Sequence, residues 1–216
     1  MTRVVLFDLD GTLIDSTDAI TGTFNYVFEQ KEFIDKPNIE KIKALIGYPL
    51  EIMFESLGVS PKHSSEFVDL YRQRYRDISC EQTILLKDSI KSLELAASFA
   101  RLGVVTTKTA KYSYPLLAHL NIDHYFECLV GREDVINPKP DPEPIYKALK
   151  KMEIDINRGD IYMIGDTKLD LIASNSANIT GLGVLSGYGT KEELLRYSDK
   201  IFDNSYEAIK YLYSKR

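Results

Sequence analysis

Short, continuous apolar runs recur along the chain, a pattern that is typical of strands buried on both faces of a parallel sheet. The first run, RVVLF, covers residues 3–7. The last and shortest, KIF, covers residues 200–202 and is expected to form an edge strand. Four similar runs lie between them, at residues 102–106, 127–131, 160–165 and 181–185. The sequence therefore predicts a parallel sheet assembled from distant parts of the chain.

Helical patterns alternate with these runs from residue 84 onward. The predicted helices cover residues 88–101, 142–152 and 168–177. Asp88 is a candidate N-cap for the first helix. Asn178 follows the third, where it tolerates the left-handed conformation that ends many helices. Alternating strands and helices predict an α/β fold with a doubly wound sheet.

The segment over residues 16–83 breaks this alternation, because it carries helical periodicity without any buried-strand run. Its four amphipathic stretches cover residues 17–30, 37–46, 49–57 and 61–78. Aromatic residues recur in them at helical spacing, which indicates a helix core rather than a ligand site. These residues are Phe24, Phe28, Tyr71 and Tyr75. We therefore predict an all-helical domain over residues 16–83, inserted into a core domain formed by residues 1–15 and 84–216.

Composition narrows the classes of protein and of partner. The chain has 216 residues, of which 44% are hydrophobic and 27% are charged, as in an ordinary globular protein. The net charge of −5 and the lack of a basic stretch argue against nucleic-acid binding. The first apolar run is too short for a signal peptide or a membrane helix, so we expect a cytoplasmic protein without a membrane partner. Its two cysteines, Cys80 and Cys128, are then expected to be thiols in a reducing compartment.

Two aspartates, Asp8 and Asp10, directly follow the first apolar run, in the sequence DLDGT. On an extended chain, residues two positions apart point to the same side. The two carboxylates therefore repel each other unless a cation or a proton lies between them. Such an arrangement costs stability, which indicates a binding site unless the two residues belong to an ordinary polar loop.

Further polar side chains follow the later predicted strands. Thr106 ends the second strand, Lys139 follows the third, and Asp166 follows the fourth. Asp170 lies in the first turn of the next predicted helix and can lean toward Asp166. In an open α/β sheet, ligands bind at the carboxyl ends of the strands. One edge of the sheet is therefore expected to gather four carboxylates, at least one hydroxyl and at least one lysine.

These residue types together predict phosphoryl chemistry. Four acids in one cleft need a hard cation, and ligation by oxygen alone favours Mg²⁺ over zinc. A substrate that contacts Mg²⁺, Lys139 and Thr106 should be anionic, and phosphate fits best. Asp8 can attack phosphorus, while Asp10 can protonate the leaving oxygen and later activate water. Gly11 permits a tight turn whose backbone N–H groups reach phosphate oxygens.

Each of these features also has an ordinary structural explanation. Two acids at this spacing occur in many loops, Thr106 could bond to its own turn, and Lys139 could be solvated. Asp166 and Asp170 could be a helix cap and a helix-start acid. Their joint occurrence, each at the end of a predicted strand, favours the catalytic interpretation.

The combination resembles the haloacid dehalogenase superfamily of phosphatases, in the branch that carries a helical cap after the first motif. The four motifs are DLDGT (8–12), VVTTK (104–108), NPKPDPEP (137–144) and GDTKLD (165–170). The resemblance covers essentially the whole chain. It implies a Rossmann-like core, Mg²⁺ as the cofactor, the activity of a phosphoric monoester hydrolase and an aspartyl-phosphate intermediate.

The resemblance also implies roles for individual residues. Asp8 is expected to be the nucleophile and Asp10 the acid/base. The expected metal ligands are Asp8, the main-chain carbonyl of Asp10, and Asp166, with Asp170 and Gly11 supporting the site. The expected phosphoryl-binding residues are Thr106, Thr107 and Lys139. Dehalogenases of the superfamily lack the second acid, so Asp10 favours phosphate esters or anhydrides as substrates.

Two stretches outside the motifs bear on the substrate. ALIGYPLEIMFESLG (44–58) resembles the cap of phosphoglycolate phosphatases and related pyrophosphatases, and GVLSGYGTKEEL (183–194) resembles the loop after their fourth motif. Phosphoglycolate is therefore the first candidate among small phosphorylated metabolites. A pyrophosphatase, a sugar phosphomutase and a non-catalytic phosphate-sensing module are the alternatives. The chain is expected to act as a monomer or a homodimer.

The chain departs from the family pattern near the mouth of the expected site. Relatives often have Pro-Gly where this chain has Lys87-Asp88, and Asn where it has Thr107. Selectivity is expected to come from the helical insertion. The candidate residues there are Gly47, Tyr48, Arg72, Arg74 and Arg76. We interpret the three arginines in the first instance as solvated helix surface.

Overall fold

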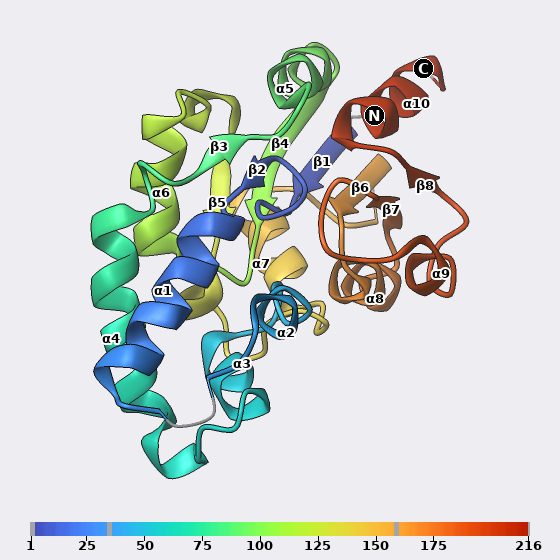
Figure 1. Cartoon of the computed structure of the whole chain (residues 1–216). Helices are drawn as coiled ribbons and strands as arrows, with labels where there is room; N and C mark the ends of the chain where they lie inside the picture. Colours follow the sequence, from blue (N-terminus) through green and yellow to red (C-terminus); the bar gives the residue numbers. More distant parts are fainter. Residues whose placement is uncertain (1–2, 34–35, 158–159, 216) are drawn as a thin grey trace.

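A six-stranded parallel sheet forms the centre of the protein, in the strand order β5-β4-β1-β6-β7-β8 (Figure 1). The computed structural model describes residues 3–33, 36–157 and 160–215. The strands are β1 (Arg3–Phe7), β4 (Ala100–Val105), β5 (Cys128–Val130), β6 (Asp160–Gly165), β7 (Thr180–Val184) and β8 (Ile201–Phe202). The predicted α/β fold with a doubly wound sheet is confirmed, and β8 is the edge strand expected near residues 200–202.

The register of β1 explains why the acids lie where they do. β1 is flanked by β4 and β6, and Phe7 lies opposite Val104 on one side and Ile164 on the other. The next residue, Asp8, still donates its backbone N–H to the carbonyl of Ile164, at 2.9 Å. The carboxyl ends of three neighbouring strands therefore meet at Asp8.

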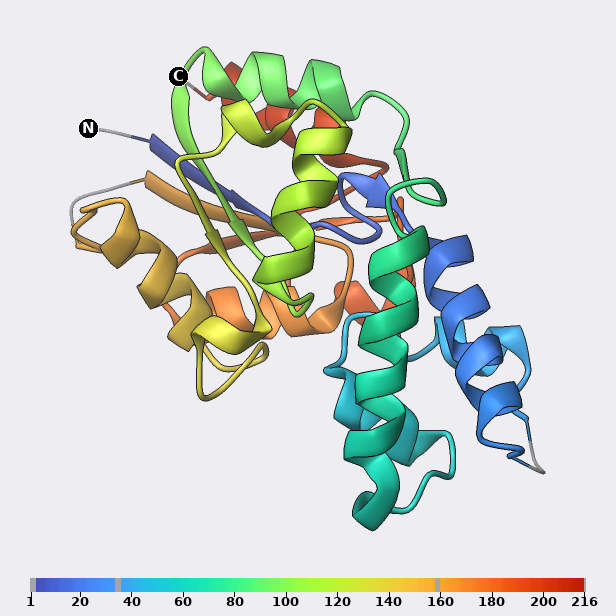
Figure 2. The same ribbon diagram turned by 90° about the vertical axis from the view of Figure 1, so that its left-hand side faces the viewer.

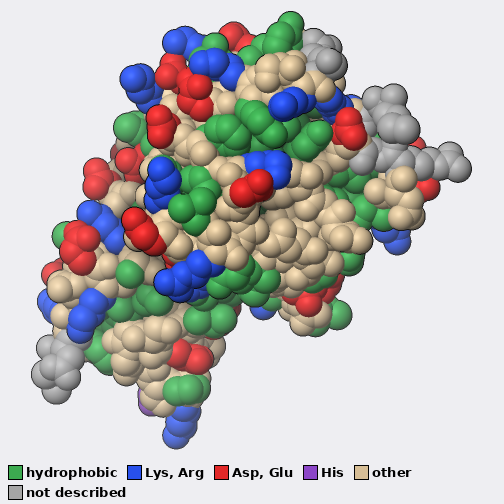
Figure 3. All heavy atoms as spheres, turned by 90° about the vertical axis from the view of Figure 1, so that its right-hand side faces the viewer, with side chains coloured by type: hydrophobic (Ala, Val, Ile, Leu, Met, Phe, Trp, Pro, Cys, Tyr) green, Lys and Arg blue, Asp and Glu red, His purple; other side chains and the backbone are tan. Residues whose placement is uncertain are grey.

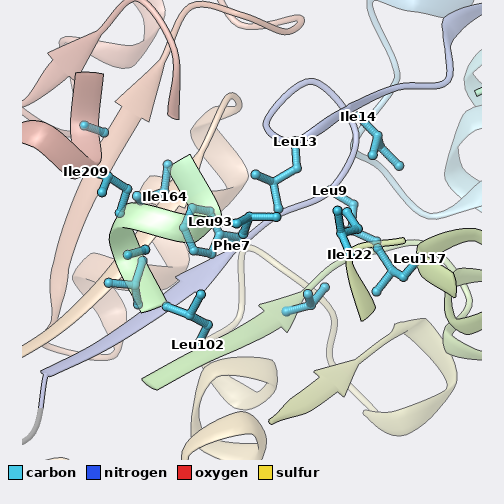
Figure 4. Packing of buried hydrophobic residues seen from close by; sticks show 14 of the residues in the cluster. Phe7, Leu9, Leu13, Ile14, Leu93, Leu102, Leu117, Ile122, Ile164 and Ile209 are labelled. Carbon is cyan, nitrogen blue, oxygen red and sulfur yellow. The ribbon is translucent and has the colours of Figure 1, made fainter. Parts of the chain in front are cut away.

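Helices cover both faces of the sheet. The larger helices of the core are α5 (Ser89–Ala97), α6 (Ala110–His119), α7 (Glu143–Lys151), α8 (Lys168–Ser176) and α10 (Ser205–Ser214). The shorter ones are α9 (Lys191–Leu194) and the 3₁₀ turns η1 (Asp123–Tyr125) and η2 (Arg132–Asp134). Successive side chains of a strand point to opposite faces. Phe7 accordingly packs with Leu93 of α5 and Ile209 of α10 (Figure 4), whereas Leu6 packs in a separate cluster with Leu149 of α7.

Four helices lie between two very short strands, β2 (Ile14–Asp15) and β3 (Ile84–Leu85), which pair antiparallel. They are α1 (Thr17–Gln30), α2 (Ile39–Lys43), α3 (Leu50–Ser56) and α4 (Pro61–Ile78). We call this group the helical insert. Figure 2 shows it gathered beyond one end of the sheet, with α1 beside α4. The four predicted helices are confirmed, while the division into domains at residues 16 and 83 stays a prediction.

The helical insert has an aromatic core of its own. The ring centroids of Phe24 and Phe54 lie 4.6 Å apart, and those of Phe24 and Tyr71 lie 4.9 Å apart. Phe28 is fully buried in the same cluster, and Tyr75 is 3% exposed. The prediction that these aromatic residues form a helix core is therefore confirmed.

The structure differs from the sequence predictions at the start of α5 and at α6. Asp88 was expected to cap α5, but its backbone is left-handed, with φ of 63°, and its side chain accepts a hydrogen bond from Lys91 instead. That conformation suits glycine, the residue expected at this position in relatives. The helix α6 was not predicted, because Pro115 interrupts its pattern. Asn178 has φ of 62°, as expected for the end of α8.

Charged side chains of both signs lie on the face of the protein that is displayed in Figure 3. Within the described ranges, none of the helices combines the length and the apolar character that crossing a bilayer requires. On the displayed face, lysine and arginine side chains alternate with aspartate and glutamate side chains.

Candidate active site

Asp8 lies at the carboxyl end of β1 and is 3% exposed. Its Oδ1 atom is 3.1 Å from Nζ of Lys139, which is within ion-pair range. This contact is an ion pair rather than a hydrogen bond, and Oδ1 has no hydrogen-bond partner. Buried polar atoms are rarely left in this state. The unpartnered oxygen therefore marks a place for a ligand.

Lys139 is the central cation of the site. It lies on the loop before α7, is 3% exposed, and donates to the carbonyl of Val105 at 3.0 Å and to Oδ1 of Asp170 at 2.6 Å. Burial lowers the pKa of the Lys139 ammonium, but the two neighbouring carboxylates outweigh this effect and raise the pKa above its ordinary value. Lys139 is therefore a fixed positive charge, and the explanation as a solvated loop lysine is wrong.

Asp166 and Asp170 complete a buried acidic group with Asp8. One carboxylate oxygen of each residue lies within 4.8 Å of the others. Asp166 accepts hydrogen bonds from Thr12 Oγ1 at 3.1 Å and from the backbone N–H of Tyr188 at 2.8 Å. Burial raises the pKa of Asp166 well above its usual range, and the charges of Asp8 and Asp170 add to this effect. The site is therefore short of positive charge.

The donor set fits a divalent cation. Burial raises the pKa of Asp8 to about 7, although Lys139 opposes the shift. An added cation would stabilise the charged form of these carboxylates, and their oxygen atoms suit a hard ion. Asp8 and Asp166 are the better placed ligands. The two oxygens of Asp166 accept hydrogen bonds from uncharged donors only, whereas Oδ1 of Asp170 is bound by the Lys139 ammonium and its Oδ2 by the backbone N–H and hydroxyl of Thr167 at the start of α8.

Asp10 faces a different set of partners. Its Oδ2 lies 3.1 Å from Nζ of Lys108, and its Oδ1 accepts a hydrogen bond from Ser16 Oγ. Nζ of Lys108 also donates to the hydroxyl of Tyr75 at 2.7 Å. Tyr75 of the helical insert is thereby linked to Asp10 through Lys108. This link was not predicted from the sequence, although Lys108 follows Thr106 and Thr107 within one motif.

Gly11 is required by the close approach of two chain segments. It has φ of +75°, and a Cβ atom at this position would lie 2.4 Å from Oδ2 of Asp166. A side chain would therefore displace the carboxylate that faces Asp8. The tight turn expected at Gly11 is present.

The two threonines lie near the site in different ways. Thr106 is 4% exposed, and its Oγ1 accepts the backbone N–H of Lys108 at 3.1 Å, which is the local turn bond expected of an ordinary threonine. Its hydroxyl proton is still available for a ligand. Thr107 lines the cavity described next. The phosphoryl-binding role of both residues stays a prediction.

A cavity of about 60 Å³ lies between the core and the helical insert. Its core wall includes Asp10, Thr107, Lys108, Tyr112 and Arg132. Its wall from the insert includes Ile20, Gly47, Tyr48, Glu51, Met53, Tyr71, Arg72 and Tyr75. The cavity therefore joins the predicted catalytic acid to residues of the insert that a leaving group could contact.

The three candidate arginines of α4 have different surroundings. Arg72 lines the cavity and pairs with Glu51 at 3.2 Å. Arg74 lies over the ring of Tyr26, with its guanidinium carbon 5.0 Å from the centroid. Arg76 has a side chain that is 61% exposed. The interpretation as solvated surface holds for Arg76 and is wrong for Arg72.

Known proteins are similar to this chain in sequence and in overall structure. The family model of the haloacid dehalogenase-like hydrolases matches residues 5–184. A phosphoglycolate phosphatase of Colwellia psychrerythraea is 29% identical over 96% of this chain and 95% of its own length. The pyrophosphatase PpaX of Anoxybacillus flavithermus is 30% identical over 90% of this chain and 89% of its own length. A haloacid dehalogenase-like family hydrolase of Streptococcus pneumoniae has a similar structure, with a TM-score of 0.86, 29% identity and 98% of each chain covered.

Proposed function

Because the chain belongs to the haloacid dehalogenase-like hydrolases, we propose that it is a Mg²⁺-dependent phosphatase of small phosphorylated metabolites, with phosphoglycolate as the first candidate substrate. The observation that carries the proposal is the unpartnered oxygen of Asp8, held 3.1 Å from the ammonium of Lys139. A carboxylate oxygen that is free of hydrogen bonds can act as a nucleophile. The adjacent cation can hold an anionic group against it.

The first chemical step transfers the phosphoryl group to Asp8. A carboxylate oxygen of Asp8 forms a bond to phosphorus, while the bond from phosphorus to the leaving oxygen breaks. Asp10 donates a proton to that leaving oxygen, so that the alcohol departs neutral. Lys139 neutralises charge on the phosphoryl oxygens, and the hydroxyl of Thr106 can donate to another of them. A Mg²⁺ ion held by Asp8, Asp166 and the main-chain carbonyl of Asp10 would neutralise further charge there.

The second step regenerates Asp8. Asp10 has now lost its proton and removes one from a water molecule, whose oxygen attacks the phosphorus of the aspartyl-phosphate. The bond between phosphorus and Asp8 breaks, and inorganic phosphate leaves. Asp170 holds Lys139 in place through both steps, because its Oδ1 accepts from Nζ at 2.6 Å. It acts as a positioning residue.

We also propose that residues 16–83 act as a cap that closes over the substrate and excludes water from the first step. The size of the cavity then limits the leaving group. A cavity of about 60 Å³ is small, which favours a small leaving group. Glycolate and phosphate are small groups, and a hexose is much larger.

A second candidate, pyrophosphate, is favoured by the same cavity size and by the name of one relative, the pyrophosphatase PpaX. A sugar phosphomutase is less consistent with the small cavity. It would also require a bisphosphate activator and would release no free phosphate. A phosphate-sensing module without catalysis is disfavoured, because no acid of the four motifs is missing. We further propose a cytoplasmic monomer or homodimer that acts on small molecules without a nucleic-acid or membrane partner.

A phosphate-release screen tests this proposal. The purified protein with Mg²⁺ is offered phosphoglycolate, pyrophosphate, nucleotides, hexose phosphates and an aryl phosphate. We expect release from one of the two small substrates at a higher kcat/KM than from any hexose phosphate. Phosphate release from none of the compounds, with Mg²⁺ binding intact, would contradict a catalytic role. A dependence on a bisphosphate activator would identify a mutase.

A further inference from the structure

Two arginines from different parts of the fold line the cavity between core and insert. Arg132 belongs to the turn η2, directly after β5 of the sheet, whereas Arg72 belongs to α4 of the helical insert. Neither residue lies in the four sequence motifs. The phosphoryl group is already provided for by Lys139, which does not line this cavity. The two arginines are therefore available to the other end of a substrate.

The hydrogen bonding of both guanidinium groups is incomplete. Nε of Arg72 and Nε of Arg132 are buried and have no hydrogen-bond partner. Arg132 donates from Nη1 to the carbonyl of Val135 at 3.1 Å. Within residues 3–33, 36–157 and 160–215 it forms no ion pair. A buried donor that stays unpaired is costly, and such donors in a cavity wall are satisfied when a ligand supplies an acceptor.

The charged residues along the cavity wall indicate which charge that ligand carries. Asp10 is paired with Lys108 at 3.1 Å, and Glu51 is paired with Arg72 at 3.2 Å. The remaining charged residue among those lining the cavity is Arg132, and the other walls are mostly aromatic and aliphatic. The cavity therefore carries one positive charge without a counterion among its lining residues. An anionic group would balance it.

We propose that Arg132, assisted by Arg72, forms a second anion subsite that binds a carboxylate or a phosphate on the leaving group. The inference rests on the proposed phosphatase function and adds the substrate class that the cavity selects. A substrate with an uncharged leaving group leaves the guanidinium of Arg132 unpaired and is therefore disfavoured. Arg72 helps because its Nε donor is unused while its Nη2 is held by Glu51.

The test compares substrates of similar size that differ in charge. Phosphoglycolate and pyrophosphate carry an anionic leaving group, and 2-hydroxyethyl phosphate carries a neutral one. We expect the wild-type protein to have a kcat/KM on the order of 10- to 100-fold higher for an anionic substrate than for the neutral one, as for a hydrogen bond to a charged group. R132M should remove most of this preference, chiefly by raising KM for the anionic substrates. A loss confined to phosphoglycolate or to pyrophosphate supports the subsite and identifies its anion.

Matched variants separate charge from packing. R72M should lower the preference in the same direction, and R132K should restore part of it. Arg74 lies on the same helix as Arg72 but contacts Tyr26, so R74M should leave the preference unchanged. If R132M does not fold, R132Q removes the charge while keeping a donor and should show the same loss.

Two results would overturn the subsite. One is an equal kcat/KM of the wild-type protein for anionic and neutral substrates. The other is an unchanged preference in folded R132M or R132Q. In both cases the phosphatase function stands, because 2-hydroxyethyl phosphate is still hydrolysed. Failure of the wild-type protein to hydrolyse any of the three substrates would instead reject the proposed function, and the subsite with it.

Discussion

The catalytic side of the core and the helical insert are built in different ways. On the core side, charged groups at neighbouring strand ends are buried and held by one another, as in the contacts of Lys139 with Asp8 and Asp170. On the insert side, an aromatic core supports tyrosines and an arginine that keeps an unused donor. We therefore propose that the edge of the sheet supplies the chemistry, while selectivity comes from the helical insert together with Arg132 of the core. Substitutions on the two sides should therefore have different effects on kcat, KM and stability. The largest loss of kcat is expected on the core side, and the smallest at the contact between core and insert.

Removing the nucleophile is expected to have the largest effect. Asp8→Asn keeps the size of the side chain but loses the carboxylate, so kcat should fall by on the order of 10⁵-fold for every substrate. Initial rates of phosphate release measure this change, and an unchanged melting temperature controls for folding. Substantial turnover in preparations free of other phosphatases would rule out Asp8 as the nucleophile.

Removing the metal should also stop turnover, because all the proposed metal ligands lie on the core side. Chelation by EDTA is expected to abolish phosphate release, and Mg²⁺ should restore it. At about 100 times its dissociation constant, Mg²⁺ should stabilise the fold by about 2.7 kcal/mol. Thermal unfolding with and without Mg²⁺ measures this effect. Asp166→Asn should lose the stabilisation, whereas a change in the insert should retain it. Full activity after exhaustive chelation would contradict a metal requirement.

Lys139→Met removes the cation that two buried carboxylates share. Breaking a buried ion pair by removing one partner costs about 3–5 kcal/mol, because a buried charge is left uncompensated. Denaturant unfolding should show this loss, and phosphate release should fall at the same time. Lys147→Met, an exposed lysine on α7, is the control and should change neither quantity appreciably. A Lys139→Met protein of unchanged stability would show that the ammonium does not hold the acidic group together.

Phe54→Ala should destabilise the insert without removing the chemistry. Truncating a fully buried phenylalanine costs about 3–5 kcal/mol. Because the reacting groups lie on the core side, KM is expected to rise more than kcat falls. Denaturant unfolding and steady-state kinetics below the unfolding temperature test this expectation. If folded Phe54→Ala protein lost as much kcat as Asp8→Asn, the insert would be required for the chemistry itself, which would contradict the proposed division of roles.

Tyr75→Phe tests the contact that joins the walls. Its hydroxyl accepts from Lys108 at 2.7 Å, and Lys108 pairs with Asp10. Losing one such hydrogen bond should lower kcat by about 2- to 10-fold through poorer placement of Asp10, which steady-state kinetics measure. Tyr71→Phe is the matched control on the same helix, because no hydrogen bond joins its hydroxyl to Lys108 in the described part of the chain. Equal effects of the two variants would assign Tyr75 a packing role only.

The sequence predicted those features that depend on local pattern. Buried runs such as residues 160–165 and the long helix over residues 61–78 carry enough periodicity to be identified, and the acids after β1 and β6 follow from strand ends. The two-residue strands β2 and β3 give no period to detect. The places of Lys108, Tyr75 and Arg132 could not be predicted, because each depends on where the helical insert lies against the core.

The central claim is that Asp8 carries the phosphoryl group during turnover. Acid quenching with substrate and Mg²⁺ present, followed by borohydride reduction, converts an aspartyl-phosphate into homoserine, which peptide mass spectrometry locates. We predict homoserine at position 8 in the wild-type protein and at neither Asp10 nor Asp166. Rapid turnover with no modified aspartate at position 8, or with the modification at another carboxylate, would contradict the account.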